Sequence, residues 1–211
     1  SKGWKLFKYC VMKGLLMINL GSPDSTSIPD VKKYLDEFLM DKRVIGKSYL
    51  FRWILVKLII LNTRPRKSAK AYKKIWWKEG SPLIVLSKRL FNKVTKSLDI
   101  PVALAMRYGS ISIKKGLDEL NKKGVKDVLV LPLYPHYAMS SYETVVEKVK
   151  EEKEINFPSL NLDIIPPFYK NPKYIEILSA KIEESIKNVE YDHLLFSCLL
   201  YTSDAADETG R

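Results

Sequence analysis

Short apolar runs alternate with longer amphipathic stretches along most of this chain. The runs are nearly continuous in apolar residues and lack the strict alternation of a strand with one face in water. Runs of this kind are typical of central parallel strands that are covered on both faces. We therefore predict strands at residues 15–20, 102–106, 125–131, 160–165 and 193–197.

The stretches between these runs have helical spacing. Val31 and Leu35 fall on one stripe of a helix, and residues 111–124, 142–153 and 172–187 follow the same spacing. Alternating strands and helices imply right-handed crossovers, so the sequence predicts an α/β fold with a doubly wound parallel sheet. Such sheets bind ligands beyond the carboxyl ends of their strands, which directs attention to the loops that follow the first three strands.

A long helical insertion, at about residues 47–98, lies between the first helix and the second strand. In its first part the apolar positions extend around much of the helix, and this excess must contact something. One alternative is packing on its own domain, which is the commoner outcome; the other is a hydrophobic lip that meets a membrane or a flat apolar ligand. The positions are Leu50, Ile54, Leu58 and Leu61 on one face, with Trp53, Val56 and Ile60 beside them.

Composition and charge narrow the classes of function. The chain has 211 residues, and a hydrophobic content of 46% is ample for a buried core. The formal net charge of +12 could indicate a nucleic-acid partner, but only 7 of the 36 basic residues are Arg. Arg is the residue that recognises bases and phosphates in a bidentate manner, so we predict no nucleic-acid partner.

Cysteine usage and hydropathy bear on metal sites and on location. Cys10 and Cys198 lie near opposite ends of the chain, outside any metal-ligand spacing, so neither a zinc site nor a disulfide framework is predicted. No apolar run reaches the roughly 18 to 20 residues of a spanning helix, and the start lacks the features of a signal peptide. We expect a cytoplasmic protein.

Both ends of the chain differ from its middle. Met12 leads directly into the first apolar run and reads as a natural start, so we expect residues 1–11 to be an upstream extension of uncertain origin. The last residues, CLLYTSDAADETGR, resemble one reading frame of a transposon-based sequencing adapter, and we expect residues 198–211 to be a non-native tail. The alternative is a genuine short helix and tail.

The loop after the first strand reads NLGSPDST. Gly21 permits a tight turn or the close approach of a ligand, and Ser25 or Ser27 could cap the next helix. The G-x-G-x-x-G and G-x-x-x-x-G-K patterns of nucleotide-binding loops are both absent. Nucleotide binding therefore loses support.

The loop after the second strand, AMRYGS, places Arg107 and Tyr108 at a strand end. A cation beside an aromatic ring can clamp a carboxylate and stack on a planar ring. The alternative is a surface Arg with a half-buried Tyr.

The loop after the third strand reads LPLYPHYAMSSYETV, and Ser140 or Ser141 could cap the helix that follows. His136 and Tyr137 are candidates for a pocket at this strand end. His136 could act as a base or a ligand, although a lone His between aromatic residues is more often structural. No nearby Ser, Asp and His form a nucleophilic triad.

Four strings in this order and spacing resemble ferrochelatases of the bacterial heme pathway: LLMINLGSPDS, RPRKSAKAYKKIWWKEGSPL, AMRYGS and LPLYPHYAMSSYETV. The resemblance covers residues 12–197. It implies two chelatase-like, Rossmann-like domains with a porphyrin cleft between them, and a helical insertion of the first domain that forms a lip over the cleft. On this basis residues 12–170 form the N-terminal domain, residues 171–197 begin the second domain, and the rest of the second domain is missing.

The resemblance also implies the chemistry. Ferrochelatases are lyases that insert ferrous iron into protoporphyrin IX to make heme, so iron is a substrate and no cofactor is expected. The family's metal-facing histidine and catalytic glutamate would lie beyond Ser197, so we assign no catalytic residue, do not equate His193 with that histidine, and expect an inactive fragment. The positions that match porphyrin contacts of the family are Leu20, Arg64, Tyr72 and Ser81, with Arg107 and Tyr108 on the opposite wall.

Two other functions fit the same residues. One is a porphyrin-binding carrier that has lost the chemistry, and the other is a chelatase for another tetrapyrrole or metal. The apolar lip leads us to expect peripheral contact with the inner face of the membrane, where an apolar porphyrin would dissolve.

Overall fold

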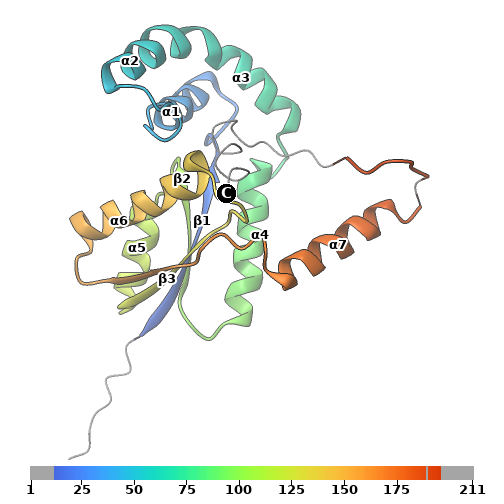
Figure 1. Cartoon of the computed structure of the whole chain (residues 1–211). Coiled ribbons are helices and arrows are strands. Elements are labelled where there is room, and N and C mark those ends of the chain that lie inside the picture. The colour runs from blue at the N-terminus through green and yellow to red at the C-terminus, as the bar shows by residue number, and fades with distance from the viewer. Residues whose placement is uncertain (1–11, 189, 196–211) are drawn as a thin grey trace, which may run out of the picture.

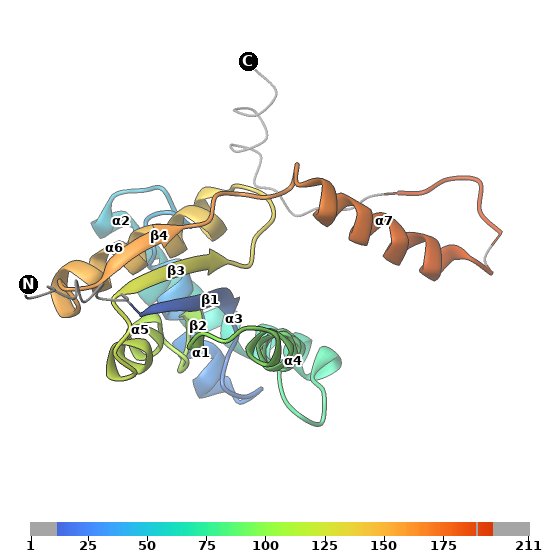
Figure 2. The same cartoon turned by 90° about the horizontal axis from the view of Figure 1, so that it is seen from below.

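The computed structural model describes residues 12–188 and 190–195 of the chain. Its centre is one sheet of four strands in the order β2-β1-β3-β4, and every neighbouring pair is parallel (Figures 1 and 2). This confirms the predicted α/β fold with a parallel sheet and the first four predicted strands. The strands are β1 (Lys13–Gly21), β2 (Val102–Tyr108), β3 (Asp127–Pro132) and β4 (Asn161–Ile164).

The fifth predicted strand is wrong for the residues that can be assessed. Residues 193–195 adopt no strand structure, and Leu195 is 90% exposed. Residues 196 and 197 lie outside the described residues. An apolar run forms a strand only when another strand pairs with it, and no described strand pairs with this segment.

Helices cover both faces of the sheet, as a doubly wound fold requires. Helix α4 (Pro82–Ser97) lies on one face, and α5 (Ile113–Lys122) and α6 (Thr144–Asn156) lie on the other (Figure 1). Successive β1 residues point to opposite faces: Leu16 packs in the core below α5 and α6, and Met17 packs in the core below α4. The sheet is therefore buried on both sides, which accounts for its continuous apolar strands.

Local signals set the ends of several helices. Ser27 caps α1 (Ile28–Leu39) by accepting a hydrogen bond from the backbone N–H of Asp30, which confirms one of the two predicted caps. The capping prediction for the serines after β3 is wrong. Ser140 and Ser141 instead lie inside η2 (Met139–Glu143), a π-helical turn that leads into α6 and has no side-chain cap.

The first part of the helical insertion runs across the carboxyl end of the sheet (Figure 1). It consists of α2 (Tyr49–Trp53), a π-helical stretch η1 (Ile54–Ile60) and α3 (Leu61–Ile75), and it packs on α1. We call α2, η1 and α3 together the lip. The small core between the lip and α1 contains Val31, Leu35, Leu39, Val56, Leu61 and Ala69.

The apolar face predicted for the lip is divided between core and surface. Leu61 is 5% exposed, whereas Leu50 is 67% exposed and Leu58 is 56% exposed. The wider turns of a π-helix do not keep residues with α-helical spacing on one side, so the stripe rotates between Ile54 and Leu61. Packing on the same domain is therefore confirmed for Val56 and Leu61, and contact of the exposed residues with a membrane or a flat ligand stays a prediction.

Helix α7 (Pro172–Ile186) extends away from the sheet in both views (Figures 1 and 2). None of its residues is buried. Ile175 is 48% exposed and Ile177 is 69% exposed. The described residues thus leave the apolar side chains of this helix largely uncovered.

Candidate functional site

The carboxyl ends of β1, β2 and β3 meet below the lip, where the sheet topology predicts a ligand site. Gly21 ends β1 with a φ of 105°, and a Cβ added there would lie 2.0 Å from the carbonyl oxygen of Tyr108. Glycine is required here by the close approach of the β2 backbone, which is neither of the two roles suggested by sequence, a tight turn or the approach of a ligand. Only glycine lets these two strand ends come together with this geometry.

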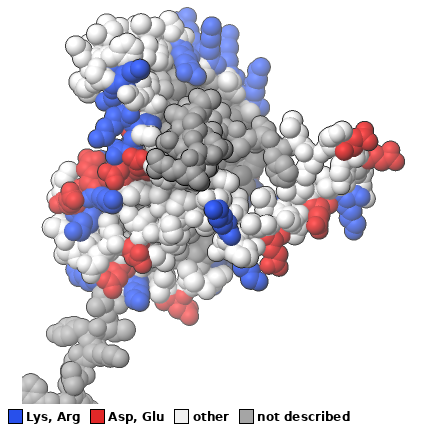
Figure 3. Space-filling model, in the orientation of Figure 1, with Lys and Arg blue, Asp and Glu red and all other residues white. Residues whose placement is uncertain are grey.

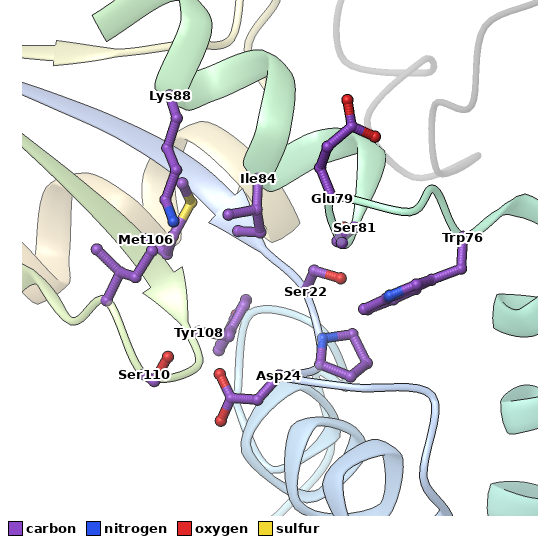
Figure 4. A pocket seen from close by; sticks show the side chains of 13 residues that line it. Ser22, Asp24, Trp76, Glu79, Ser81, Ile84, Lys88, Met106, Tyr108 and Ser110 are labelled. Carbon is purple, nitrogen blue, oxygen red and sulfur yellow. The ribbon is translucent and has the colours of Figure 1, made fainter. Parts of the chain in front are cut away.

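A pocket of about 280 Å³ opens at this edge (Figure 4). Three segments form it: the loop after β1, the connection between α3 and α4, and the loop after β2. Ser22 is 7% exposed, and its buried hydroxyl has no hydrogen-bond partner among the described residues. The lining side chains labelled in Figure 4 include Ser22, Asp24, Trp76, Glu79, Ser81, Ile84, Lys88, Met106, Tyr108 and Ser110.

A tight turn places Ser81 in this pocket. The N–H of Trp77 donates to the carbonyl of Gly80 at 3.0 Å, and the N–H of Gly80 donates back to the carbonyl of Trp77 at 3.1 Å. Gly80 has a φ of 125°, which favours glycine. Ser81 follows as the first residue before α4, is buried, and makes no capping hydrogen bond with its side chain.

Aromatic rings extend from the pocket along the lip. The ring of Tyr72 meets that of Trp76 edge to face at 6.1 Å, and Tyr72 meets Tyr34 in the same manner at 6.5 Å. Burial raises the pKa of Tyr72, and the positive charge of Arg64 partly offsets this rise. Arg64 itself is exposed, so its guanidinium is accessible at the edge of this aromatic group.

Leu20 lies at the end of β1 and is half-buried. Its N–H donates to the side-chain oxygen of Asn19 at 2.8 Å, and the amide of Asn19 donates to the hydroxyl of Ser87 on α4 at 3.0 Å. These bonds fix the backbone that presents Leu20. Next to them lies an apolar hollow of about 540 Å³, lined by Asn19, Leu83, Leu86, Ser87, Leu90, Leu133, Pro135, Phe168 and Tyr174.

Arg107 and Tyr108 are held by an acidic residue that the sequence analysis missed. Arg107 Nη2 lies 2.5 Å from Asp41 Oδ2, and Tyr108 Oη donates to the same oxygen at 3.0 Å. The guanidinium carbon of Arg107 also lies 4.3 Å from the ring centroid of Tyr108. The only sequence signal for Asp41 is its position directly after the apolar stripe of α1.

The environment of this group shifts two pKa values in opposite directions. Burial is the largest influence on Asp41 and by itself raises its pKa, but hydrogen bonds from Thr144, the N–H of Arg43 and Tyr108, with the charge of Arg107, leave the pKa below its usual value. Burial raises the pKa of Tyr108 far above that of a free phenol. Tyr108 is therefore a neutral hydrogen-bond donor, and Asp41 is a carboxylate.

His136 and Tyr137 lie outside the pocket of Figure 4. His136 is exposed and stacks on the ring of Tyr169 at 5.2 Å. Tyr137 Oη donates to Glu143 Oε2 at 2.5 Å. The carbonyl of Pro135 accepts from the N–H of Tyr169 at 2.9 Å, so this loop is held against the segment after β4. His136 and Tyr137 thus make these contacts outside the pocket, and a role for either residue in ligand binding stays a prediction.

Within the described ranges, no three His, Cys, Asp or Glu side chains come together in a group that could hold a metal ion. Of the sequence-predicted residues, the structure brings Ser81 and Tyr108 into one pocket and Tyr72 next to its rim. It places Arg107 in an internal ion pair. The pocket residues that were not predicted from sequence include Ser22 and Trp76.

Comparison with known proteins identifies relatives over most of the chain. The family model called Ferrochelatase matches residues 12–198. A ferrochelatase of Opitutus terrae is 48% identical over 188 residues, which are 88% of this chain and 54% of that protein. A ferrochelatase of Pseudomonas fluorescens biotype C is 46% identical over 87% of this chain and 54% of its own length, and one of Coxiella burnetii is 41% identical over 87% and 51%. The chain spans about half the length of the curated relatives it matches.

Proposed function

Because this chain belongs to the ferrochelatase family, we propose that it supplies the N-terminal, porphyrin-binding half of an enzyme that inserts ferrous iron into protoporphyrin IX to make heme. The observation that carries the proposal is the pocket at the carboxyl ends of β1 and β2, which lies below the lip. Ferrous iron enters as a substrate, so the reaction requires no resident cofactor in this half.

The chemistry of the site suits a porphyrin. An apolar macrocycle with two carboxylate arms needs apolar and aromatic walls with a few polar groups at the edge. Trp76 and Tyr108 line the pocket and provide such walls, Tyr72 extends them along the lip through its contact with Trp76, and Ser81 provides a hydroxyl. Arg64 is the exposed guanidinium beside them and can bind a propionate in a bidentate manner.

Porphyrin metallation also needs a base for two pyrrole protons and a path for the metal. We assign neither role to the described residues, since His136 stacks on Tyr169 outside the pocket and the described part holds no metal-ligand cluster. We propose that the part of the enzyme not covered by this chain supplies the base. The contribution of this half is then to bind and orient the ring, which lowers the barrier by positioning.

The lip supports a second element of the proposal, which is peripheral contact with the inner face of an anionic membrane. Exposed apolar side chains on α2 and η1 lie beside α3, and Figure 3 shows basic side chains gathered there. The sequence of α3 contains six basic residues and no acidic one. Each basic residue near an anionic surface contributes about 1 kcal/mol. The exposed apolar residues are Tyr49, Leu50, Phe51, Trp53, Ile54, Leu58 and Ile59.

A search of the described helices for one long and apolar enough to cross a membrane found none. The proposed contact therefore places the lip at the surface of the bilayer, with the apolar side chains inserted and the α3 cations at the level of the headgroups.

Titration of the 211-residue chain with protoporphyrin IX tests the porphyrin proposal, with the shift of the Soret band as the signal. We expect saturable binding that weakens about tenfold or more in Arg64→Ala, because one bidentate charge-assisted contact is lost. Arg66→Ala is the matched control, since Arg66 lies on the same helix but lines a separate hollow with residues 25–28. Equal binding by wild type, Arg64→Ala and Arg66→Ala would contradict the assignment of Arg64, and no binding by wild type would contradict the function.

A further inference from the structure

We propose that Asp41 is a positioning residue that holds Arg107 and Tyr108 in the pocket wall and fixes the start of the lip to α6. In this arrangement Arg107 acts on the ligand through Tyr108 and does not itself bind a ligand carboxylate. The relevance to porphyrin rests on the proposed function, whereas the positioning itself is a property of the chain alone.

The buried carboxylate of Asp41 accepts hydrogen bonds from several parts of the chain. Its side chain is 5% exposed. One carboxylate oxygen, Oδ2, accepts hydrogen bonds from Arg107 Nη2, Tyr108 Oη and Thr144 Oγ1. The other, Oδ1, accepts from the backbone N–H of Arg43 at 2.8 Å. Four donors from three separate parts of the chain thus converge on one buried carboxylate.

The guanidinium of Arg107 is already bound by Asp41 and Thr144. Its Nε donates to the hydroxyl of Thr144 at 2.7 Å and to the carbonyl of Thr144 at 3.1 Å. Its side chain is only 13% exposed and its charge is already paired with Asp41. Breaking a buried ion pair is strongly unfavourable, because it leaves a buried charge without its partner. A ligand carboxylate would have to compete with Asp41 for this guanidinium.

Ion pairs anchor the connection that leads into the lip. Asp41 lies in the connection between α1 and α2, and the same connection carries Arg43. Arg43 Nε contacts Glu143 Oε1 at 3.0 Å, and its Nη2 contacts Glu147 Oε2 at 3.1 Å. The connection that leads into the lip is therefore tied to η2 and α6 by Asp41 and Arg43, two charged residues separated by one position.

This network reaches the pocket through Tyr108. The ring of Tyr108 lines the pocket and packs edge to face on Phe38 at 5.3 Å and on Tyr34 at 6.4 Å, both in α1. A change at Asp41 is transmitted to the pocket wall and to the helix on which the lip packs.

The two possible roles of Arg107 predict opposite effects of Asp41→Asn on the affinity for protoporphyrin IX. If Arg107 bound a propionate, Asp41→Asn would free its charge and maintain or increase the affinity for protoporphyrin IX, while Arg107→Met would decrease it. If Arg107 is held by Asp41 for positioning, both variants weaken binding by similar factors. The double variant Asp41→Asn/Arg107→Met, which leaves no unpaired buried charge, should then bind no more weakly than either single variant.

The direct test is independent of porphyrin. The 211-residue chain is treated with phenylglyoxal, and modification of each Arg is followed by peptide mass spectrometry. In wild type we expect Arg107 to react far more slowly than the exposed Arg64, and in Asp41→Asn we expect its rate to rise about tenfold or more once the pair is lost. Asp118→Asn, a change at an exposed carboxylate paired with Lys122 on α5, should alter neither rate.

A second pair of variants, at Thr144, keeps the test decisive if Asp41→Asn does not fold. Thr144→Val removes the hydroxyl that bonds to Arg107 and Asp41 but keeps the ion pair, so a smaller rise in Arg107 modification is expected. Thr144→Ser keeps the hydroxyl and should restore the slow rate. An Arg107 that reacts as fast as Arg64 in wild type, or stays protected in both Asp41→Asn and Thr144→Val, overturns the proposal. Absence of porphyrin binding by wild type overturns only the proposed function, because the modification rates still decide the role of Asp41.

Discussion

Gly21→Ala should destabilise the chain more than most single substitutions, because the backbone and the neighbouring strand both oppose a side chain at this position. The φ of Gly21 is 105°, a conformation that costs a residue with a Cβ about 1–3 kcal/mol. The new Cβ would also lie 2.0 Å from the carbonyl oxygen of Tyr108, far inside the 3.0 Å that real contacts respect. The last β1–β2 pair, Gly21 with Tyr108, must therefore separate.

Loss of one or two hydrogen bonds at this strand end adds about 1 kcal/mol for each, so the total is about 2–5 kcal/mol. With a urea m-value of about 2 kcal/mol/M, the midpoint of unfolding should fall by about 1–2.5 M. Circular dichroism during urea titration measures this directly. Gly46→Ala is the matched control, since no atom lies within 4 Å of its added Cβ and its φ is not positive.

We expect Gly46→Ala to be neutral or slightly stabilising, by up to about 1 kcal/mol, because it restricts the unfolded chain. A Gly21→Ala protein within about 0.5 kcal/mol of wild type, a difference typical of unconstrained surface substitutions, would refute the reasoning. It would mean that β1 and β2 do not approach closely at the rim of the pocket.

Three further predictions concern the lip, the acid response and activity. The double variant Leu50→Ser/Leu58→Ser should sediment less with vesicles of equal parts phosphatidylcholine and phosphatidylglycerol, and its melting temperature should stay nearly unchanged. Leu61→Ala, in contrast, should lower the unfolding free energy by about 2–5 kcal/mol. The opposite pattern would show that the exposed face is ordinary core. Because the folded pKa of Asp41 lies below the unfolded value of 3.8, its contribution to stability is present above that pH and disappears as the pH falls through the folded pKa. Urea titrations should therefore show a loss in Asp41→Asn that is largest at neutral pH and shrinks in acid, and a loss independent of pH would contradict this. Metallation of protoporphyrin IX by the 211-residue chain with ferrous iron or zinc should remain at background, and turnover that depends on the protein would contradict our assignment of the base to the remaining half.

The parts of this structure that follow from sequence are those in which neighbouring residues decide the outcome. Continuous apolar runs indicated parallel strands covered on both faces, and β1 is such a strand. The fifth predicted strand failed because its formation depends on a partner strand, which composition cannot show. The apolar face predicted for the lip is split between core and surface because η1 is π-helical, and α-helical spacing does not predict the wider turns of a π-helix.

In the candidate site, too, sequence indicates some residues and misses those whose role depends on distant parts of the chain. Tyr108 lies at the end of a predicted strand and was singled out for that reason, whereas Ser81 was proposed only through the resemblance to ferrochelatases, and Ser22 and Trp76 were not singled out. Asp41 could not be found from sequence because its partners Arg107 and Thr144 lie 66 and 103 residues away, and only the folded chain brings them together.

We propose that porphyrin binds at the carboxyl edge of the sheet, below the lip. Hydrogen–deuterium exchange of the 211-residue chain with and without protoporphyrin IX tests it most directly. We predict that porphyrin slows exchange at residues 20–24, 76–81 and 107–111, which border the pocket, and leaves α6 unchanged. Protection confined to α6 or α7, with none in the three pocket segments, would contradict the claim.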